Sequence, residues 1–226
     1  MARLVVPSAI AVATEAEVQR HVLKDTSVGA HTDEELDVLC AILNGVSAAT
    51  EGYIGGPVIT RSFTEKYDGG VERIFLLQRP VQSVASVKEE GTLLTLAEDY
   101  YVYAQEGFLL RASGGGALWW AKGYRERDLN RVYWTTKPQG IEVTYTAGRA
   151  TQTGSGASLT AVTYTDPRDE AIRTAALLWI HELWATGPAN MSNQLTESGN
   201  VIRPAGIPPQ VAKLLEPYRL PAVGAV

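Results

Sequence analysis

Cysteine, histidine and methionine are scarce in this sequence of 226 residues, which holds one, three and two of them. The single cysteine, Cys40, excludes an intramolecular disulfide and a metal site made of several thiolates, and it fits a reducing compartment. Long apolar runs are also missing, because Arg173 and Thr174 interrupt the densest one, at 171–180. We therefore expect a protein that is not embedded in a membrane.

An excess of basic residues is absent as well. Lys and Arg number 20 against 25 Asp and Glu, so the formal net charge is -5 and the isoelectric point is about 5.3. Binding along a phosphate backbone needs a surplus of cations that this composition does not supply. The composition therefore disfavours a protein that grips nucleic acid over much of its surface, while its 45% of hydrophobic residues is typical of a folded chain.

Two capping boxes mark the starts of two N-terminal helices. Thr14 pairs with Glu17, and Thr32 pairs with Glu35, and apolar residues follow each pair at helical spacing. The pattern predicts a short first helix and a longer second one that ends near the Gly-Gly-Pro sequence at 55–57. Cys40 lies on the apolar side of the second helix, which indicates burial rather than reactivity.

Between residues 57 and 148 the apolar period changes to two, and glycine-containing turns separate short apolar runs. This rhythm predicts antiparallel strands. The segment 58–77, with Asp-Gly-Gly at 68–70, is expected to form a hairpin of two paired strands. A further strand is expected at 131–135, and the alternating strand at 141–146 should bury one of its faces.

The C-terminal third of the chain begins with a Gly/Ser/Thr-rich stretch at 149–165, which is expected to be a flexible linker. An Asp-Pro pair then predicts a third, strongly apolar helix over 166–186. The remaining residues, 187–226, are rich in Gly, Pro and polar residues and contain a short amphipathic helix at 208–218. A helix of this length needs a surface to dock on, either its own domain or a neighbour.

The predicted fold class is therefore α+β. We expect a small helical bundle of two N-terminal helices plus the long apolar third helix, with an inserted antiparallel β-region and a C-terminal tail that ends in a short helix. The predicted divisions are an N-terminal arm at 1–13, a main domain at 14–186 and a C-terminal arm at 187–226. Within the main domain, the helices occupy 14–56 and 166–186, the β-insertion 57–148 and the linker 149–165.

No group of residues in the sequence fits a catalytic, cofactor or metal site. His181-Glu182 begins like a zinc-protease helix, but Ala185 stands where the second imidazole is needed. The glycines at 114–116 lack the Lys-Ser or Lys-Thr that completes a phosphate-binding loop. We expect no catalytic residue and no cofactor, and an enzyme with dispersed carboxylates remains the alternative from another functional class.

Aromatic residues and arginines gather between residues 119 and 134, as they do at hot spots of protein interfaces. Binding of single-stranded nucleic acid and an ordinary core role are the alternatives for this segment. The apolar face of the last helix is the second candidate surface. The candidate interface residues are Trp119, Trp120 and Trp134 in the first segment and Val211, Leu214, Leu215 and Tyr218 in the second.

Three motifs follow one another along the chain: Ile74–Val87 with Arg-Pro-Val near its centre, Ile141–Gly148, and Pro167–Leu178. Their sequences and their order resemble the head-tail connector (adaptor) proteins of tailed bacteriophages, the gp6-like family. The resemblance spans about residues 32–186.

The resemblance implies a structural protein of the virion without enzyme activity, assembled in the cytoplasm of a bacterial host and located at the head-tail interface. It implies a homo-oligomeric ring, dodecameric in the particle, that sits beneath the portal protein and receives a stopper or tail-completion protein. The ring would extend the DNA channel and let double-stranded DNA pass without sequence-specific binding, which suits the acidic composition. The alternatives are a stopper, tail-completion or other virion structural protein.

Overall fold

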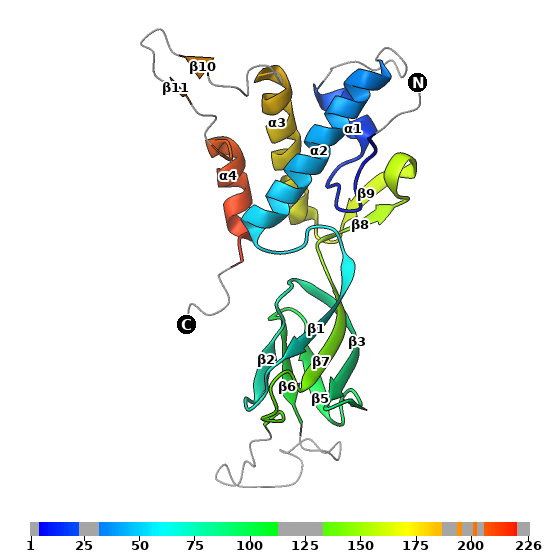
Figure 1. Ribbon diagram of the computed structural model, residues 1–226, viewed down its shortest axis with the longest axis vertical. Helices are drawn as coiled ribbons and strands as arrows, with labels where there is room; N and C mark the ends of the chain where they lie inside the picture. The colour runs from blue at the N-terminus through cyan, green and yellow to red at the C-terminus, as the bar shows by residue number, and fades with distance from the viewer. Residues whose placement is uncertain are drawn as a thin grey trace. The chain divides into compact units, whose positions relative to one another are not determined.

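The computed structural model describes residues 5–22, 32–112, 133–186, 194–195, 201–202 and 206–220. The chain forms two compact units (Figure 1): a helical unit from residues 1–59 and 149–226, and a β-unit from residues 60–148 inserted between them. The described residues contain four α-helices and antiparallel sheets, so the predicted mixture of helices with an antiparallel β-region is confirmed. No helix within these ranges is long and apolar enough to cross a membrane.

The first two helices are α1, Glu15–Val22, and α2, Asp33–Ile54. Each begins with its predicted capping box, in which the hydroxyl of Thr14 or Thr32 accepts a hydrogen bond from the backbone N–H three residues later, at 3.2 and 3.3 Å. α2 ends at Gly55, whose φ of 79° lies in the left-handed region that glycine adopts without strain. Local capping chemistry therefore sets both helix starts.

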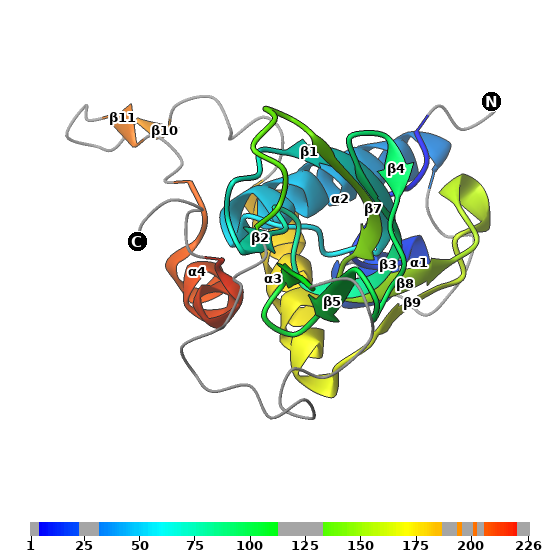
Figure 2. The same ribbon diagram turned by 90° about the horizontal axis from the view of Figure 1, so that it is seen from below.

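The other two helices lie near the end of the chain. α3, Glu170–Thr186, follows a 3-10 turn at Pro167–Asp169, and it lies against α1, α2 and α4 (Figures 1 and 2). α4, Pro209–Leu215, continues into a 3-10 turn at Glu216–Tyr218. A short antiparallel pair, β10 at Gln194–Leu195 and β11 at Val201–Ile202, precedes α4. The inward face of α3 is fully buried at Ile172, Ala175, Ala176 and Ile180.

The described part of the predicted N-terminal arm at 1–13 packs into the helical core. Ala11, Val12 and Ala13 are fully buried, and the Val12 N–H donates to the Ser47 hydroxyl of α2 at 3.2 Å. Asn44 of α2 also exchanges hydrogen bonds with this segment, accepting from Ser8 N–H at 2.7 Å. Burial of its apolar side chains holds residues 5–13 against α2.

The stretch at 149–165 is an ordered hairpin, so the prediction of a flexible linker is wrong. β8, Ala150–Thr153, pairs antiparallel with β9, Ala161–Tyr164. Gly154 makes the turn possible because its φ is 84° and a Cβ there would lie 2.0 Å from the Ser158 carbonyl oxygen. The helical core holds this hairpin in place, because Ala150 of β8 and the alternating residues Val162 and Tyr164 of β9 are buried in it.

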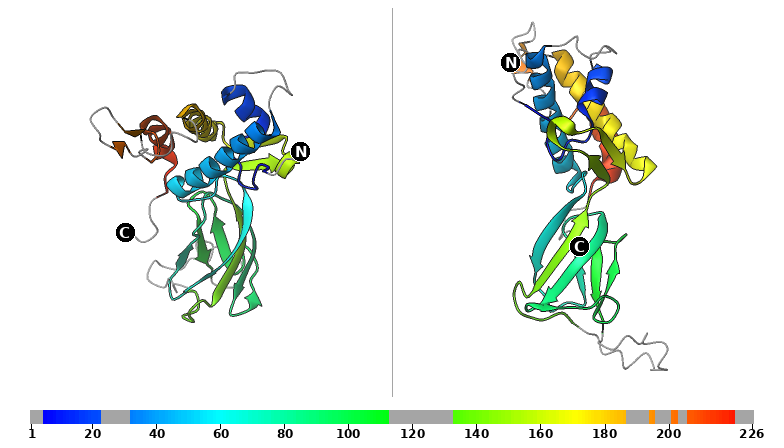
Figure 3. Two further views of the ribbon diagram at one scale, coloured as in Figure 1. Left: turned by 45° about the horizontal axis from the view of Figure 1, so that its top comes forward. Right: turned by 90° about the vertical axis from the view of Figure 1, so that its right-hand side faces the viewer.

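Two antiparallel sheets make up the β-unit (Figure 3). In spatial order, the first sheet contains β1 (Arg61–Tyr67), β7 (Ile141–Ala147), β3 (Val81–Glu89) and β4 (Thr92–Leu93). The second sheet contains β2 (Arg73–Phe75), β6 (Phe108–Arg111) and β5 (Tyr100–Tyr103). Side chains from both sheets, including Ile74 and Val143, form one core.

The predicted hairpin at 58–77 is wrong, because β1 pairs with β7 and β2 pairs with β6. The two glycines between β1 and β2 serve a close crossing instead of a hairpin turn. Gly70 N–H donates to the Trp134 and Thr135 carbonyls at 3.0 and 2.9 Å, and a Cβ at Gly69 would lie 1.8 Å from the Thr135 oxygen. The described residues 133–135 therefore run as an irregular segment, and they form no strand, contrary to prediction.

Two burial predictions are confirmed. Ile141, Val143 and Tyr145 of β7 are fully buried, while the residues between them are partly exposed. Cys40 is buried on α2, where its thiol lies 3.6 Å from a carboxylate oxygen of Glu15. Both positions follow from periodic apolar patterns that a single element carries.

Candidate interaction surfaces

The predicted contact residues of the Trp-rich segment divide into two groups. Trp119 and Trp120 lie outside the described residues. Trp134 is 1% exposed in the β-unit core, where its indole N–H donates to the Glu72 carbonyl at 3.2 Å. The Arg111 guanidinium covers its ring at 5.6 Å. Trp134 therefore has the core role that was the alternative to a contact surface, because a buried ring with a satisfied N–H presents nothing to a partner.

The apolar face of α4 is covered by the helical unit itself. Val211 and Leu215 are buried in its core, and Leu214 and Tyr218 pack partly buried against it. The Tyr218 hydroxyl donates to the Arg168 carbonyl at 2.6 Å. Of the two docking possibilities for this helix, its own domain is the one observed: the unit covers Val211 and Leu215, while Leu214 and Tyr218 stay partly accessible.

A buried ion pair supports this docking. The Arg149 guanidinium, next to β8, lies 3.2 Å from the Asp169 carboxylate before α3 and 5.4 Å from the centre of the Tyr218 ring. Burial raises the pKa of Asp169 above its usual value, and the charge of Arg149 opposes that shift. The cluster connects the start of β8, the turn before α3 and the turn after α4.

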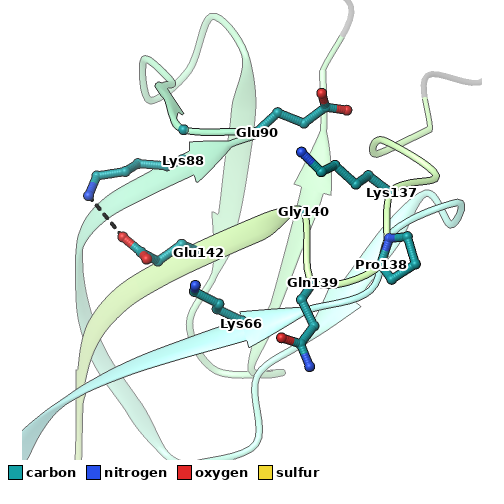
Figure 4. Close-up of a pocket in the computed structure, with 9 residues that line it drawn as sticks. Lys66, Lys88, Glu90, Lys137, Pro138, Gln139, Gly140 and Glu142 are labelled. Atoms are coloured by element: carbon teal, nitrogen blue, oxygen red, sulfur yellow. Dashed lines mark hydrogen bonds and ion pairs between the residues drawn. The ribbon is translucent and has the colours of Figure 1, made fainter.

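Lysine side chains gather around an open hollow of about 520 Å³ on the four-stranded sheet (Figure 4). Lys66 comes from β1, Lys88 from β3 and Lys137 from the segment before β7. Lys88 pairs with Glu142 at 2.8 Å, and this hydrogen bond and charge lower the pKa of Glu142. Within the described residues, Lys66 and Lys137 make no ion pair, so the hollow, which Glu90 also lines, can attract an anionic group.

The outer face of the three-stranded sheet carries a row of aromatic side chains. Phe75, Phe108 and Tyr103 stand opposite one another on β2, β6 and β5. The Phe108 ring centre lies 5.6 Å from that of Phe75 and 4.6 Å from that of Tyr103, and the Arg73 guanidinium lies 5.3 Å above Phe108. Phe75 is 51% and Tyr103 41% exposed. This aromatic row has the composition of an interface hot spot.

Sequence reasoning missed the aromatic row. Its three rings come from separate strands, and the pairing register brings them together. The available signal was the alternation within each strand, as in Arg73-Ile74-Phe75, where Ile74 is 3% exposed. That alternation marks two faces but does not say which of them is covered.

A carboxylate with two phenols lies on the inner side of the four-stranded sheet. Tyr67 and Tyr145 both donate to Glu65, and burial raises the pKa of both phenols. The phenols accept the backbone N–H groups of Leu77 and Gln78 at 3.1 and 3.0 Å. Because these hydrogen-bond partners all belong to the β-unit itself, this cluster has a structural role.

The described residues offer few candidates for metal binding or acid-base catalysis. No group of three or more His, Cys, Asp and Glu residues there could hold a metal ion. His181 is exposed, and its ring lies 6.3 Å from that of His21 in an edge-on arrangement.

Charge is distributed unevenly between the two units. The β-unit sequence carries eleven basic and eleven acidic residues, whereas the helical-unit sequence carries nine and fourteen. The whole net charge of -5 therefore belongs to the helical unit. The first turn of α2 contributes three of these acidic residues, Asp33, Glu34 and Glu35, where the helix dipole favours them.

No family model matches this sequence, and no curated protein matches it. The fold is similar to that of a chain in the virion of a native gene transfer agent particle, with 18% identity, a TM-score of 0.53 and coverage of 99% of this chain and 97% of that chain. It is also similar to a chain in the neck of an empty particle computed with C6 symmetry, with 17% identity, a TM-score of 0.55 and the same coverage. A chain in the neck of the native particle, computed with C12 symmetry, gives 16% identity, a TM-score of 0.50 and coverage of 99% and 95%. The chain thus shares its fold, over nearly its whole length, with components of gene transfer agent particles.

Proposed function

We propose that this protein is a structural component of the neck of a phage-like particle, namely its head-tail connector or adaptor. The observation that carries the proposal is the similarity of fold over 99% of the chain to chains from gene transfer agent necks. A match of this length includes the helical unit and its β-insertion together, whereas a common superfold matches one unit only.

In this role the protein forms a homo-oligomeric ring beneath the portal protein, dodecameric in the particle, and receives a stopper or tail-completion protein. It would work without a cofactor or enzyme activity, at the head-tail interface of a virion assembled in a bacterial host. The C6 and C12 symmetries named for the neck structures of the similar chains support a ring.

The charge distribution supports a channel that DNA passes without being held. A helical unit with an excess of five acidic residues and a β-unit without net charge release few counterions on meeting a phosphate backbone. Sequence-independent sticking is therefore weak, as a conduit for double-stranded DNA requires.

Native mass spectrometry of the purified protein, alone and mixed with the portal protein of its own particle, tests the proposal. We expect a portal complex that contains this chain in ring stoichiometry. A stopper or tail-completion protein would join only a complex in which another protein already covers the portal. A chain indifferent to both the portal and its complexes contradicts the proposal, and an unrelated acidic protein of similar mass is the control.

A further inference from the structure

One face of the β-unit exposes apolar side chains that its own core does not use. By register, Arg73 and Phe75 of β2 share the outer face of the three-stranded sheet with Phe108 of β6 and Tyr103 of β5. The opposite face is covered, since Leu109 is fully buried. Phe75 and Tyr103 stay about half exposed although each lies against the Phe108 ring. Phe108 itself is 9% exposed and fills the space between them, so two adjacent exposed rings with a shared base, rather than scattered apolar residues, mark a candidate interaction site.

One exposed face of α2 in the helical unit carries mostly small side chains. Its residues follow one another at intervals of four and three, which is the spacing of a seam along one side of a helix. Each is exposed: Glu34, Val38, Ala41, Gly45, Ala48 and Gly52. Val38, at 38% exposure, is one of the large apolar side chains that this unit leaves accessible.

The two glycines of this α2 seam are not explained by the described residues. A Cβ at Gly45 or Gly52 would meet no atom within 4 Å. Glycine inside a helix is unfavourable relative to alanine, so its presence at open positions needs another cause. An outside element that approaches the helix backbone closely is such a cause.

The aromatic row and the α2 seam are complementary in shape and charge. Projecting rings on the sheet match a helix face of small residues, with Val38 as an apolar contact. Arg73 and Glu34 make no ion pair with any other described residue, and they carry opposite charges at the two surfaces. We propose that the outer face of the β2-β6-β5 sheet of one molecule packs against the α2 seam of a second copy of this chain.

This contact joins two different faces, so it is head-to-tail. In a dimer, one molecule still has an unused sheet face and the other an unused α2 seam. Repetition of such a contact produces a closed ring when the rotation fits. The inference rests on the proposed function, which requires a ring, and it names the surfaces through which neighbouring subunits meet.

Disulfide trapping tests the contact directly, because the natural thiol can be removed. In a Cys40→Ala background, Phe75→Cys is combined with Cys at Ala41, Gly45 or Ala48 in turn, and the full chain is oxidised mildly. We expect at least one combination to give a ladder of covalent oligomers on a denaturing gel, while each single-cysteine variant gives only the monomer band. A covalent dimer from Phe75→Cys alone indicates a sheet that meets its own copy, and it overturns the head-to-tail arrangement, as does the absence of a ladder.

A mixing experiment gives a second readout. Phe75→Asp blocks the sheet face and Gly45→Lys blocks the seam, and both positions are exposed, so both variants should fold. Each variant alone should lose the ring species, and an equimolar mixture should give a 1:1 dimer, because one intact contact remains. The matched controls are Leu93→Asp on the other sheet, where the side chain is 64% exposed, and Ala185→Lys on α3.

The outcomes separate the two proposals. A wild-type chain that forms no ring, alone or on the portal, contradicts the proposed function and the contact together. A wild-type ring that persists in Phe75→Asp and Gly45→Lys overturns the contact and leaves the function standing. Loss of the ring in Lys66→Glu with Lys137→Glu, but not in Phe75→Asp, places the subunit contact at the lysine hollow instead, and it also overturns the proposed contact.

Discussion

Tyr145 of β7 donates a hydrogen bond to the Glu65 carboxylate of β1, with 2.5 Å between the phenol and carboxylate oxygens. Tyr67 donates to the same carboxylate, and the two phenols accept the N–H groups of Leu77 and Gln78. One acidic side chain thus fixes two strands and the backbone that follows β2. A charged group on the inner face of a sheet is tolerated here because charge-assisted hydrogen bonds satisfy it.

Replacing Tyr145 with Phe should destabilise the β-unit. The change removes a donor to Glu65 and the acceptor of the Gln78 N–H, and leaving buried polar groups unsatisfied costs about 1–3 kcal/mol. Urea unfolding followed by circular dichroism measures the loss. Thr144→Val is the matched control, because its hydroxyl meets Thr64 at 3.0 Å on the exposed face and should matter less. Equal losses in the two variants would contradict the central role of the cluster.

Alkaline pH should unfold the protein through its buried tyrosines. Burial raises the pKa of Tyr67, Tyr145 and Tyr164 above the usual value of 10.0. Because the folded state holds these protons more tightly, their contribution to stability is complete below pH 10 and is lost as the pH rises toward the folded values. The ultraviolet absorbance of tyrosinate should therefore rise in two steps, the second together with loss of helical circular dichroism. A single step for all ten tyrosines before unfolding would contradict this prediction.

Two glycine-to-alanine changes should have opposite effects. Gly69→Ala places a Cβ against the Thr135 carbonyl, so we expect a loss of roughly 1–3 kcal/mol, typical of overpacking, or more. Gly45→Ala meets open space inside α2 and should stabilise the monomer by about 1 kcal/mol. Thermal unfolding of both variants at one protein concentration checks the signs, and a destabilised Gly45→Ala monomer would show that the helix face is already covered within the chain.

Shortening a buried side chain of α4 should destabilise the helical unit, because this helix is part of the core and not a free arm. Leu215 is fully buried, so Leu215→Ala should cost about 2–5 kcal/mol in the free energy of unfolding. Lys213→Ala, two residues away and exposed, is the control and should change little. If urea unfolding gives the same midpoint for Leu215→Ala and the wild type, α4 does not belong to this core.

Local chemistry made part of the fold predictable. The capping boxes at Thr14 and Thr32 act within three residues of the chain, and the alternation of 141–146 lies in one strand, so no distant partner was needed to predict either. Strand pairing was different. The Gly69-Gly70 pair is typical of a hairpin turn. In the structure these glycines instead allow the backbone to pass close to residues 134–135, which are distant in the sequence.

The candidate surfaces were harder to predict for a related reason. Trp134 has the residue type of a contact hot spot, yet the position of Glu72 turns its indole into a core group. Phe75 and Tyr103 are ordinary strand residues in sequence, and they meet on one face of a sheet, on either side of Phe108, only because β6 lies between their strands. Residue type therefore identifies what a side chain can do, while register and burial decide whether it is offered to a partner.

The chain leaves and re-enters the helical unit at adjacent backbone positions. Ile59 forms a β-bridge with Ala150, and the Val58 carbonyl accepts the N–H groups of both Arg149 and Ala150, at 2.7 and 2.9 Å. Whatever lies between these positions has to return to the same place, and the closure entropy of a loop changes only slowly with its length. The inserted unit is therefore a replaceable module: evolution or an engineer can lengthen, shorten or exchange it while the helical scaffold keeps its hydrogen bonds.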